Sequence, residues 1–70
     1  MHKGLITIIA GTKLRQFREE RGIPLGLLAN YLVISVSTLI SIERNKKNLT
    51  ADQIVKTCEL FDINKSDLLE

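Results

Sequence analysis

The sequence has very few residues that could build a site through metal or covalent chemistry. Its 70 residues include one cysteine, Cys58, and one histidine, His2. A single cysteine excludes an internal disulfide framework, and no CxxC motif or Cys/His cluster offers a zinc site. No Ser/His/Asp, Cys/His or paired-carboxylate arrangement predicts an active site. We therefore expect no metal, no cofactor, no small-molecule substrate and no enzymatic activity.

Aromatic residues and long apolar runs are also scarce. Aromatics make up 4% of the chain and tryptophan is absent, whereas 44% of the residues are hydrophobic. This composition favours one small domain of interlocking helices over a β-sandwich. The longest apolar stretch, IPLGLLANYLVI, contains a proline, a glycine and an asparagine, and it is shorter than the roughly 18 residues of a membrane span. The N-terminal LITII is too short for a signal peptide, so we expect a cytoplasmic protein.

The net charge of +2 is unevenly distributed along the chain. Residues 1–50 contain eight Lys and Arg against three acidic residues, whereas residues 51–70 contain two Lys against five acidic residues. The chain therefore has a basic part of about +5 and an acidic end of about −3. Such an asymmetry is typical of a surface that meets a polyanion.

Apolar spacing and helix caps predict five short helices. Gly22 should end the first helix, Ser35 should cap the third, and Thr50 with Gln53 forms a capping box at the fourth. The basic segment ERNKKN should close the third helix and form a loop. The fourth helix should bury Ile54, Cys58 and Phe61. The expected ranges are about Thr12–Arg21, from Pro24 to about Leu32, from Ser35 to the ERNKKN segment, from Thr50 past Phe61, and Ser66–Leu69.

The N-terminal LITII segment allows three interpretations. It is β-prone and lies between Gly4 and Gly11, so it could be a short strand that pairs with its copy in a second subunit. It could also be an arm over the core or an extension of the first helix. We therefore divide the chain into an N-terminal arm, residues 1–11, with a strand for dimerisation as one alternative, and a helical domain, residues 12–70.

Three stretches, LRQFREERG, LANYLVISVSTLISIERNKKN and TADQIVKTCELFDINKSDLL, occur in an order that resembles a known family. The chain resembles the compact five-helix domain of phage repressors and Cro-type regulators, the XRE family, over about four-fifths of its length. The resemblance implies an all-α, lambda-repressor-like fold and a bacterial or phage-encoded regulator of transcription. Its partner would be double-stranded DNA, and the protein would act as a homodimer.

The resemblance also assigns roles to particular positions. Its reading helix lies in the major groove, so the residues that match its base contacts are Val36, Ser37, Thr38, Ile40 and Ser41. The residues expected at phosphates are Leu25, Tyr31, Arg44, Lys46, Lys47 and Asn48, with Tyr31 equally able to pack on a neighbour. Arg18 and Glu43 match an ion pair that links the first helix to the third.

Several positions depart from the family pattern. Leu25 stands where Gln is frequent, and Val33 replaces the usual Gly of the turn, so we expect a rebuilt turn with an altered helix angle. Aliphatic side chains on the reading helix supply few of the hydrogen bonds that distinguish bases. An alternative function is therefore a protein-interaction module, such as an antirepressor or an assembly partner. Its surface would be one exposed apolar face formed by Leu25, Leu27, Val36 and Ile40.

Overall fold

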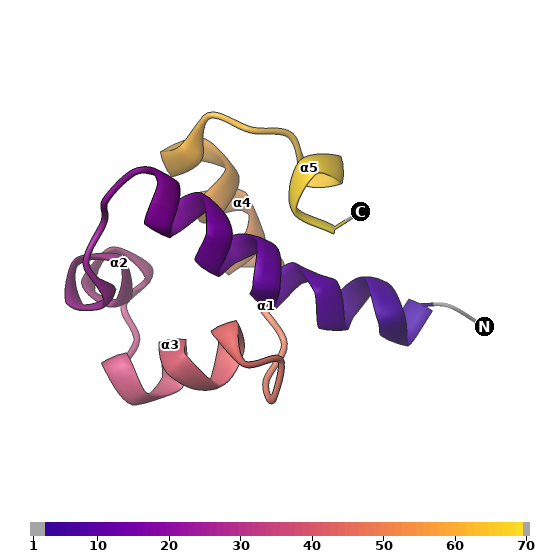
Figure 1. The fold of residues 1–70 in the computed structure, drawn as a ribbon, viewed down its shortest axis with the longest axis horizontal. Coiled ribbons are helices and arrows are strands. Elements are labelled where there is room, and N and C mark those ends of the chain that lie inside the picture. Colours follow the sequence, from indigo (N-terminus) through magenta and orange to yellow (C-terminus); the bar gives the residue numbers. More distant parts are fainter. Residues whose placement is uncertain (1–2, 70) are drawn as a thin grey trace.

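Five helices make up the part of the chain that can be described. The computed structural model describes the backbone of residues 3–69 and the side chains of residues 10–69. The helices are α1 (Lys3–Glu20), α2 (Leu25–Leu32), α3 (Val36–Glu43), α4 (Ala51–Phe61) and α5 (Lys65–Leu69). No strand occurs within this range, so the predicted all-α, five-helix class is confirmed. Helix α1 crosses the middle of the molecule, with α2 and α3 on one side and α4 and α5 on the other (Figure 1).

The LITII segment belongs to α1. This helix begins at Lys3 and crosses the predicted boundary between residues 11 and 12 without a break. The short-strand alternative is therefore wrong, and the alternative of a longer first helix is confirmed. Local β-propensity is weak when the same residues can continue an existing helix, because each added residue gains a hydrogen bond without a new nucleus. The first turns of α1 extend beyond the other helices (Figure 1).

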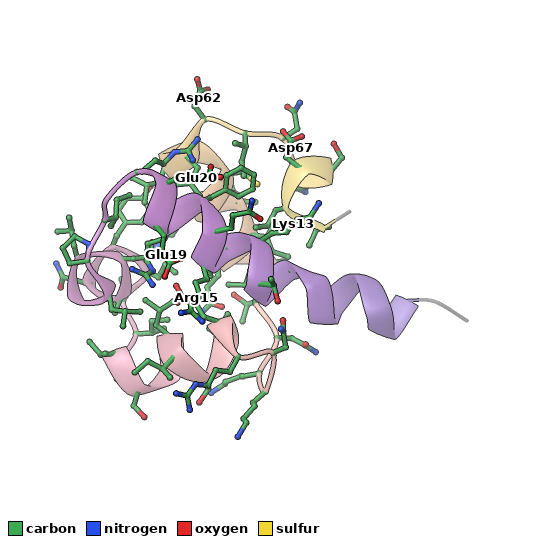
Figure 2. All side chains as sticks on the ribbon, in the orientation of Figure 1. Lys13, Arg15, Glu19, Glu20, Asp62 and Asp67 are labelled. Atoms are coloured by element: carbon green, nitrogen blue, oxygen red, sulfur yellow. The ribbon has the colours of Figure 1, made fainter. Side chains whose placement is uncertain are left out.

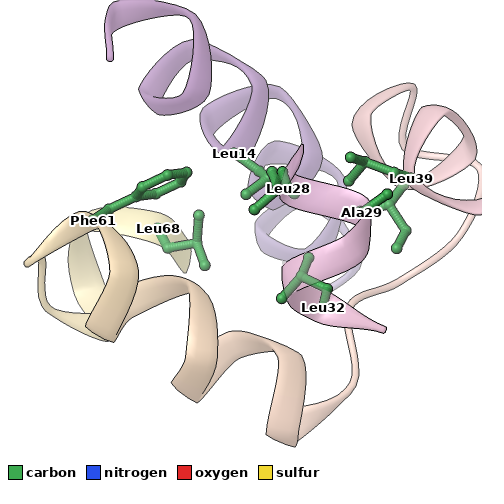
Figure 3. Close-up of a cluster of buried hydrophobic side chains, with 8 residues drawn as sticks. Leu14, Leu28, Ala29, Leu32, Leu39, Phe61 and Leu68 are labelled. Carbon is green, nitrogen blue, oxygen red and sulfur yellow. The ribbon is translucent and has the colours of Figure 1, made fainter. Parts of the chain in front are cut away.

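The core lies where α1 meets the other four helices. Its fully or nearly buried side chains, most of which are labelled in Figure 3, are Leu14, Leu28, Ala29, Leu32, Leu39, Ile42, Phe61 and Leu68. In α4 the predicted core face is only partly right, since Ile54 and Cys58 are half-buried while Thr57 is fully buried. Burial raises the pKa of the Cys58 thiol, so this cysteine is protonated and unreactive at neutral pH.

The predicted starts of α2, α3 and α4 are confirmed, whereas α1 begins at Lys3 rather than near Thr12. Ser35 caps α3 by accepting a hydrogen bond from the Thr38 backbone N–H at 3.0 Å. Thr50 and Gln53 form both hydrogen bonds of the capping box at α4. Helix α2 begins directly after Pro24, whose fixed φ suits this position. These caps satisfy backbone N–H groups that a helix cannot pair internally, which is why the start points can be recognised in the sequence.

Four helices end in the same backbone motif. A residue one or two positions after the helix has a left-handed conformation, and the N–H of the residue that follows it bonds back to a carbonyl five positions earlier. At α2, for example, the Ile34 N–H donates to the Ala29 carbonyl at 3.0 Å. Only the first of the four left-handed residues is glycine. They are Gly22, Val33, Asn45 and Asp62.

Val33 corrects the expectation of a rebuilt turn. Its φ of 59° and ψ of 47° are left-handed, although a β-branched side chain is strained there. The two backbone hydrogen bonds of the motif and the packing of Ile34 against the core offset this strain. The side chain of Val33 is 79% exposed, so nothing else holds it in place. The bend between α2 and α3 is 101°, within the range of about 90–120° that is usual for the motif.

Arg18 and Glu43 connect α1 to α3 as predicted. Arg18 Nε donates to Glu43 Oε2 at 2.7 Å, and Nη2 donates to Oε1 at 3.1 Å. A third hydrogen bond runs from Arg18 Nη1 to the Ile23 carbonyl at 2.8 Å. The hydrogen bonds to Glu43 raise the pKa of the Arg18 guanidinium above its ordinary value, against the opposing effect of burial. The guanidinium therefore stays charged, and its three hydrogen bonds fix its position between the two helices.

Replacing Val33 with glycine should stabilise the domain. Val33→Gly removes the strain of a β-branched residue at positive φ and loses no contact, so we expect a gain of about 1 kcal/mol in the free energy of unfolding. Chemical denaturation measures it. The matched control, Val55→Gly on the exposed side of α4, should lose about 0.5 kcal/mol. A loss of stability in Val33→Gly would contradict the assigned strain.

Removing one partner of the buried ion pair should lower the free energy of unfolding far more than removing both partners. Arg18→Met leaves the Glu43 carboxylate buried and unpaired, so we expect a loss of about 3–5 kcal/mol. Adding Glu43→Leu should restore most of that loss, because no buried charge then remains. Arg15→Met, which breaks only the exposed pair with Glu19, should cost less than about 1 kcal/mol. Denaturation of the four proteins checks this, and equal losses for Arg18→Met and Arg15→Met would contradict it.

Candidate nucleic-acid interface

Helix α3 presents a continuous face on the side away from the core. Leu39 and Ile42 point inward, so residues about half a helical turn away point outward. The steps of 100° along a helix place four of the five residues expected at bases on this outward face: Val36, Ser37, Ile40 and Ser41. Val36 and Ser37, in the N-terminal half, are exposed, whereas Ile40 and Ser41 are half-buried.

Thr38, the fifth residue expected at bases, lies at the edge of this face. Its backbone N–H and its side-chain oxygen both bond to Ser35, and the Ser35 hydroxyl donates to Thr38 Oγ1 at 2.9 Å. Thr38 is therefore part of the cap that begins α3. Its hydroxyl hydrogen is still free to donate elsewhere, so the structure gives it a structural role without excluding a contact.

A hollow of about 180 Å³ lies between α1 and the two helices of the motif. Leu25 and Ile40 form its apolar part, and Arg15 and Arg44 form its basic part, with the Arg18–Glu43 pair also on its wall. Arg15 is the functional candidate that the sequence did not single out, because only folding brings α1 beside α3. Figure 2 shows Arg15 on the side of α1 that faces α3.

Some basic residues bond to other groups within the domain, whereas others are exposed on its surface. Arg18 is paired within the domain, and Arg21 lies over the Phe17 and Phe61 rings and donates to the Phe61 carbonyl at 2.8 Å. Arg44, Lys46 and Lys47 are exposed at the end of α3 and in the loop that follows, next to the exposed Asn48. In contrast, the labelled Asp62, at the end of α4, and Asp67, in α5, lie on the opposite side of α1 (Figure 2). The charge asymmetry of the sequence is therefore an asymmetry in space.

Two of the predicted residues lie elsewhere. Tyr31 lines a second hollow of about 290 Å³, together with Leu27 and Leu60. The structure therefore does not bring Tyr31 together with Leu25 and Arg44. It also separates Leu27 from Leu25, so the four aliphatic residues expected to share one exposed face do not line one hollow. Leu25 and Leu27 are two residues apart in α2, so their side chains point about 200° apart around the helix axis.

The described part of the chain contains no metal-binding cluster and no single membrane-spanning helix. Between residues 3 and 69, no three His, Cys, Asp or Glu side chains come together in a way that could hold a metal ion. No single helix in the same range is long and apolar enough to cross a membrane, and only α2 and α3 taken as a bent pair pass that test of length and composition.

Comparison with known proteins identifies relatives of this arrangement. The profile of the helix-turn-helix family matches residues 14–68. A curated protein from Thermococcus gammatolerans, which carries the provisional description of an HTH-type transcriptional regulatory protein, is 36% identical over 59 residues. That match covers 84% of this chain and 19% of the relative, so the chain spans about a fifth of the relative's length.

Solved structures give the same fold. The clp gene regulator ClgR from Corynebacterium glutamicum superposes with a TM-score of 0.82 at 26% identity, over 91% of this chain and 68% of that one. The restriction-modification controller protein C.AhdI from Aeromonas hydrophila gives a TM-score of 0.76 at 26% identity, over 89% and 94% of the two chains. With a profile match that spans both helices of the motif and the core around them, the chain belongs to the helix-turn-helix family of XRE and phage-repressor type.

Proposed function

We propose that this chain is the DNA-binding domain of a transcriptional regulator, with α3 in the major groove. The observation that carries the proposal is the outward face of α3, which is flanked by the free cations Arg44, Lys46 and Lys47. A helix about as wide as the groove presents its side chains to base edges, while cations at its end meet the phosphates. The regulatory descriptions of the relatives support this function over an enzymatic one.

The proposed contacts predict strong dependence on phosphates and limited selection among bases. Val36 and Ile40 can contact thymine methyl groups, and the hydroxyls of Ser37 and Ser41 can form single hydrogen bonds with base edges. None of these side chains forms the bidentate hydrogen bonds that identify guanine or adenine. Arg15 joins Arg44 at the wall of the hollow, so we add it to the proposed phosphate contacts.

We further propose that the protein binds as a homodimer. Two copies related by a twofold axis would place their α3 helices in successive major grooves, about one helical turn apart. The N-terminal turns of α1, which extend beyond the other helices, provide an element for contact between copies (Figure 1). A cytoplasmic location and a bacterial or phage origin stay predictions of the sequence.

The alternative of a protein-interaction module is less well supported. It requires one contiguous apolar face, yet Leu25 and Ile40 are half-buried beside Arg44 while Leu27 lines the second hollow. Of the four residues, only Leu27 and Val36 are exposed, at 60% and 42%. An interaction surface at these residues would therefore be small and mixed with positive charge.

Selection from random duplex DNA at low salt tests the proposed function directly. We expect enrichment of an inverted repeat whose half-sites are about 10 base pairs apart, with few strongly fixed positions in each half. Sequencing of the bound fraction gives the site, and sedimentation of the complex gives the number of chains. No retained DNA at low salt would contradict DNA binding, and a single half-site bound by one chain would contradict the homodimer.

Removal of the loop cations should weaken binding to every DNA sequence. Lys46→Ala with Lys47→Ala removes two phosphate contacts, so the slope of log affinity against log salt should become shallower by about 1–2. Adding Arg15→Ala to this double variant should make the slope shallower by about one more. Titration of a labelled duplex at several salt concentrations measures the slope.

A charge-matched control separates contact from net charge. Lys56→Ala with Lys65→Ala removes the same two charges from α4 and α5, on the other side of α1 (Figure 1). We expect the salt slope of this variant to equal that of the wild type, because side chains that contact no phosphate release no counterion. Equal changes in both double variants would contradict the proposed location of the interface.

A further inference from the structure

The end of α3 differs from the other helix ends of this type. At α1, α2 and α4, the residue after the left-handed position is an isoleucine that packs against the core: Ile23, Ile34 and Ile63. Such an apolar contact is what usually holds this backbone motif in place. At α3 the corresponding residue is Lys46, which is exposed. The helix end that leads into the basic loop therefore has no apolar side chain to hold it.

The side chain of Asn45 provides a different connection. Its Nδ2 donates to Thr12 Oγ1 of α1 at 2.9 Å, across 33 residues of sequence. We call this hydrogen bond the Asn45 bridge. Asn45 Oδ1 is buried and has no hydrogen-bond partner among the described residues, whereas the residue as a whole is half-buried. Its φ of 62° is a conformation that asparagine adopts more readily than most residues.

Gly11 allows the two helices to come together at this point. It is buried within α1, and a Cβ atom there would overlap the Ile42 carbonyl oxygen and Asn45 Oδ1. Glycine weakens a helix relative to alanine, so its presence is explained by the close approach of α1 to the end of α3. Gly11 and the Asn45 bridge thus fix the same junction from both sides.

We infer that Asn45 is a positioning residue for DNA binding, an inference that rests on the proposed function. The Asn45 bridge holds the start of the loop against α1. Lys46 occupies the position that carries a core-packed isoleucine at the other three helix ends. Lys46 and Lys47 therefore face solvent from a backbone that is already ordered. A cation on an ordered backbone meets a phosphate without the entropy loss of ordering the loop first.

Asn45→Gly tests this role, because glycine keeps the positive φ and removes only the bridge. At fixed salt we expect DNA affinity to fall about threefold to tenfold, the range for losing one pre-ordered contact region. In the Lys46→Ala/Lys47→Ala background the same change should alter affinity less than about twofold, because the cations it positions are gone. An equal loss in both backgrounds, or no loss in either, would overturn the inference.

Variants at Thr12 test the acceptor side of the Asn45 bridge, which lies in α1. Thr12→Val should reproduce the loss of affinity seen with Asn45→Gly, whereas Thr12→Ser, which keeps the hydroxyl, should bind as the wild type does. The melting temperature of Asn45→Gly should equal or exceed that of the wild type, since glycine suits the left-handed position. A weaker affinity that only follows a lower melting temperature would assign Asn45 to stability alone and reject the inference.

Backbone relaxation of the free protein separates this inference from the proposed function. In Asn45→Gly the amide order parameters of Lys46 and Lys47 should fall from about 0.85 towards 0.6 or below. If they fall while wild-type protein retains no DNA at low salt, the proposed function fails and control of the loop by the bridge is supported. Unchanged order parameters would overturn the inference whatever the DNA result.

Discussion

The guanidinium of Arg18 joins the three segments from which the candidate interface is built. From α1 it donates two hydrogen bonds to Glu43 in α3 and one to the Ile23 carbonyl, directly before α2. The position of both motif helices relative to α1 therefore depends on one planar group with fixed donor directions. A buried pair of this kind gains little net free energy, because desolvation opposes the attraction. Its main contribution is to select one arrangement of the helices.

Backbone strain is concentrated at the left-handed residues where four of the helices end. Four ends use left-handed residues, and only Gly22 adopts that conformation without strain. Val33 is the most strained of them, yet it lies in the turn between α2 and α3, where Ile34 must be directed into the core. Burial of the following isoleucine and two backbone hydrogen bonds outweigh a strain of about 1–2 kcal/mol. Fold geometry, in this turn, overrides residue preference.

The candidate interface combines an outward face of small hydroxyls and aliphatics with cations at its edge. Arg44, Lys46 and Lys47 follow the face along the chain, whereas Arg15 reaches it only through folding. Phosphate contacts supply affinity and register without sequence information, and the outward face of α3 offers few groups that distinguish bases. Binding by a domain of this type depends on the positions of its cations. The junction of Gly11, Thr12 and Asn45 matters because, by our inference, it orders the loop that carries Lys46 and Lys47.

The sequence by itself determined the features that depend on neighbouring residues. Ser35 and the pair Thr50 and Gln53 mark helix starts because a cap acts within one turn, and apolar spacing indicated the helices that follow by the same local logic. It also placed the basic loop after α3.

Only the tertiary structure decided features that require distant segments to meet. Arg15 joins Arg44 at one hollow, Leu27 faces a different hollow from Leu25, and Thr57 rather than its neighbours is fully buried. The left-handed conformation of Val33 and the helical state of LITII also went against local propensity. At Val33 the packing of the adjoining isoleucine outweighs a conformational strain of about 1–2 kcal/mol. In LITII the continuation of α1 outweighs a weaker preference for the β conformation. Local chemistry thus fixed where α2, α3 and α4 begin, and contacts between helices decided which side chains share a surface.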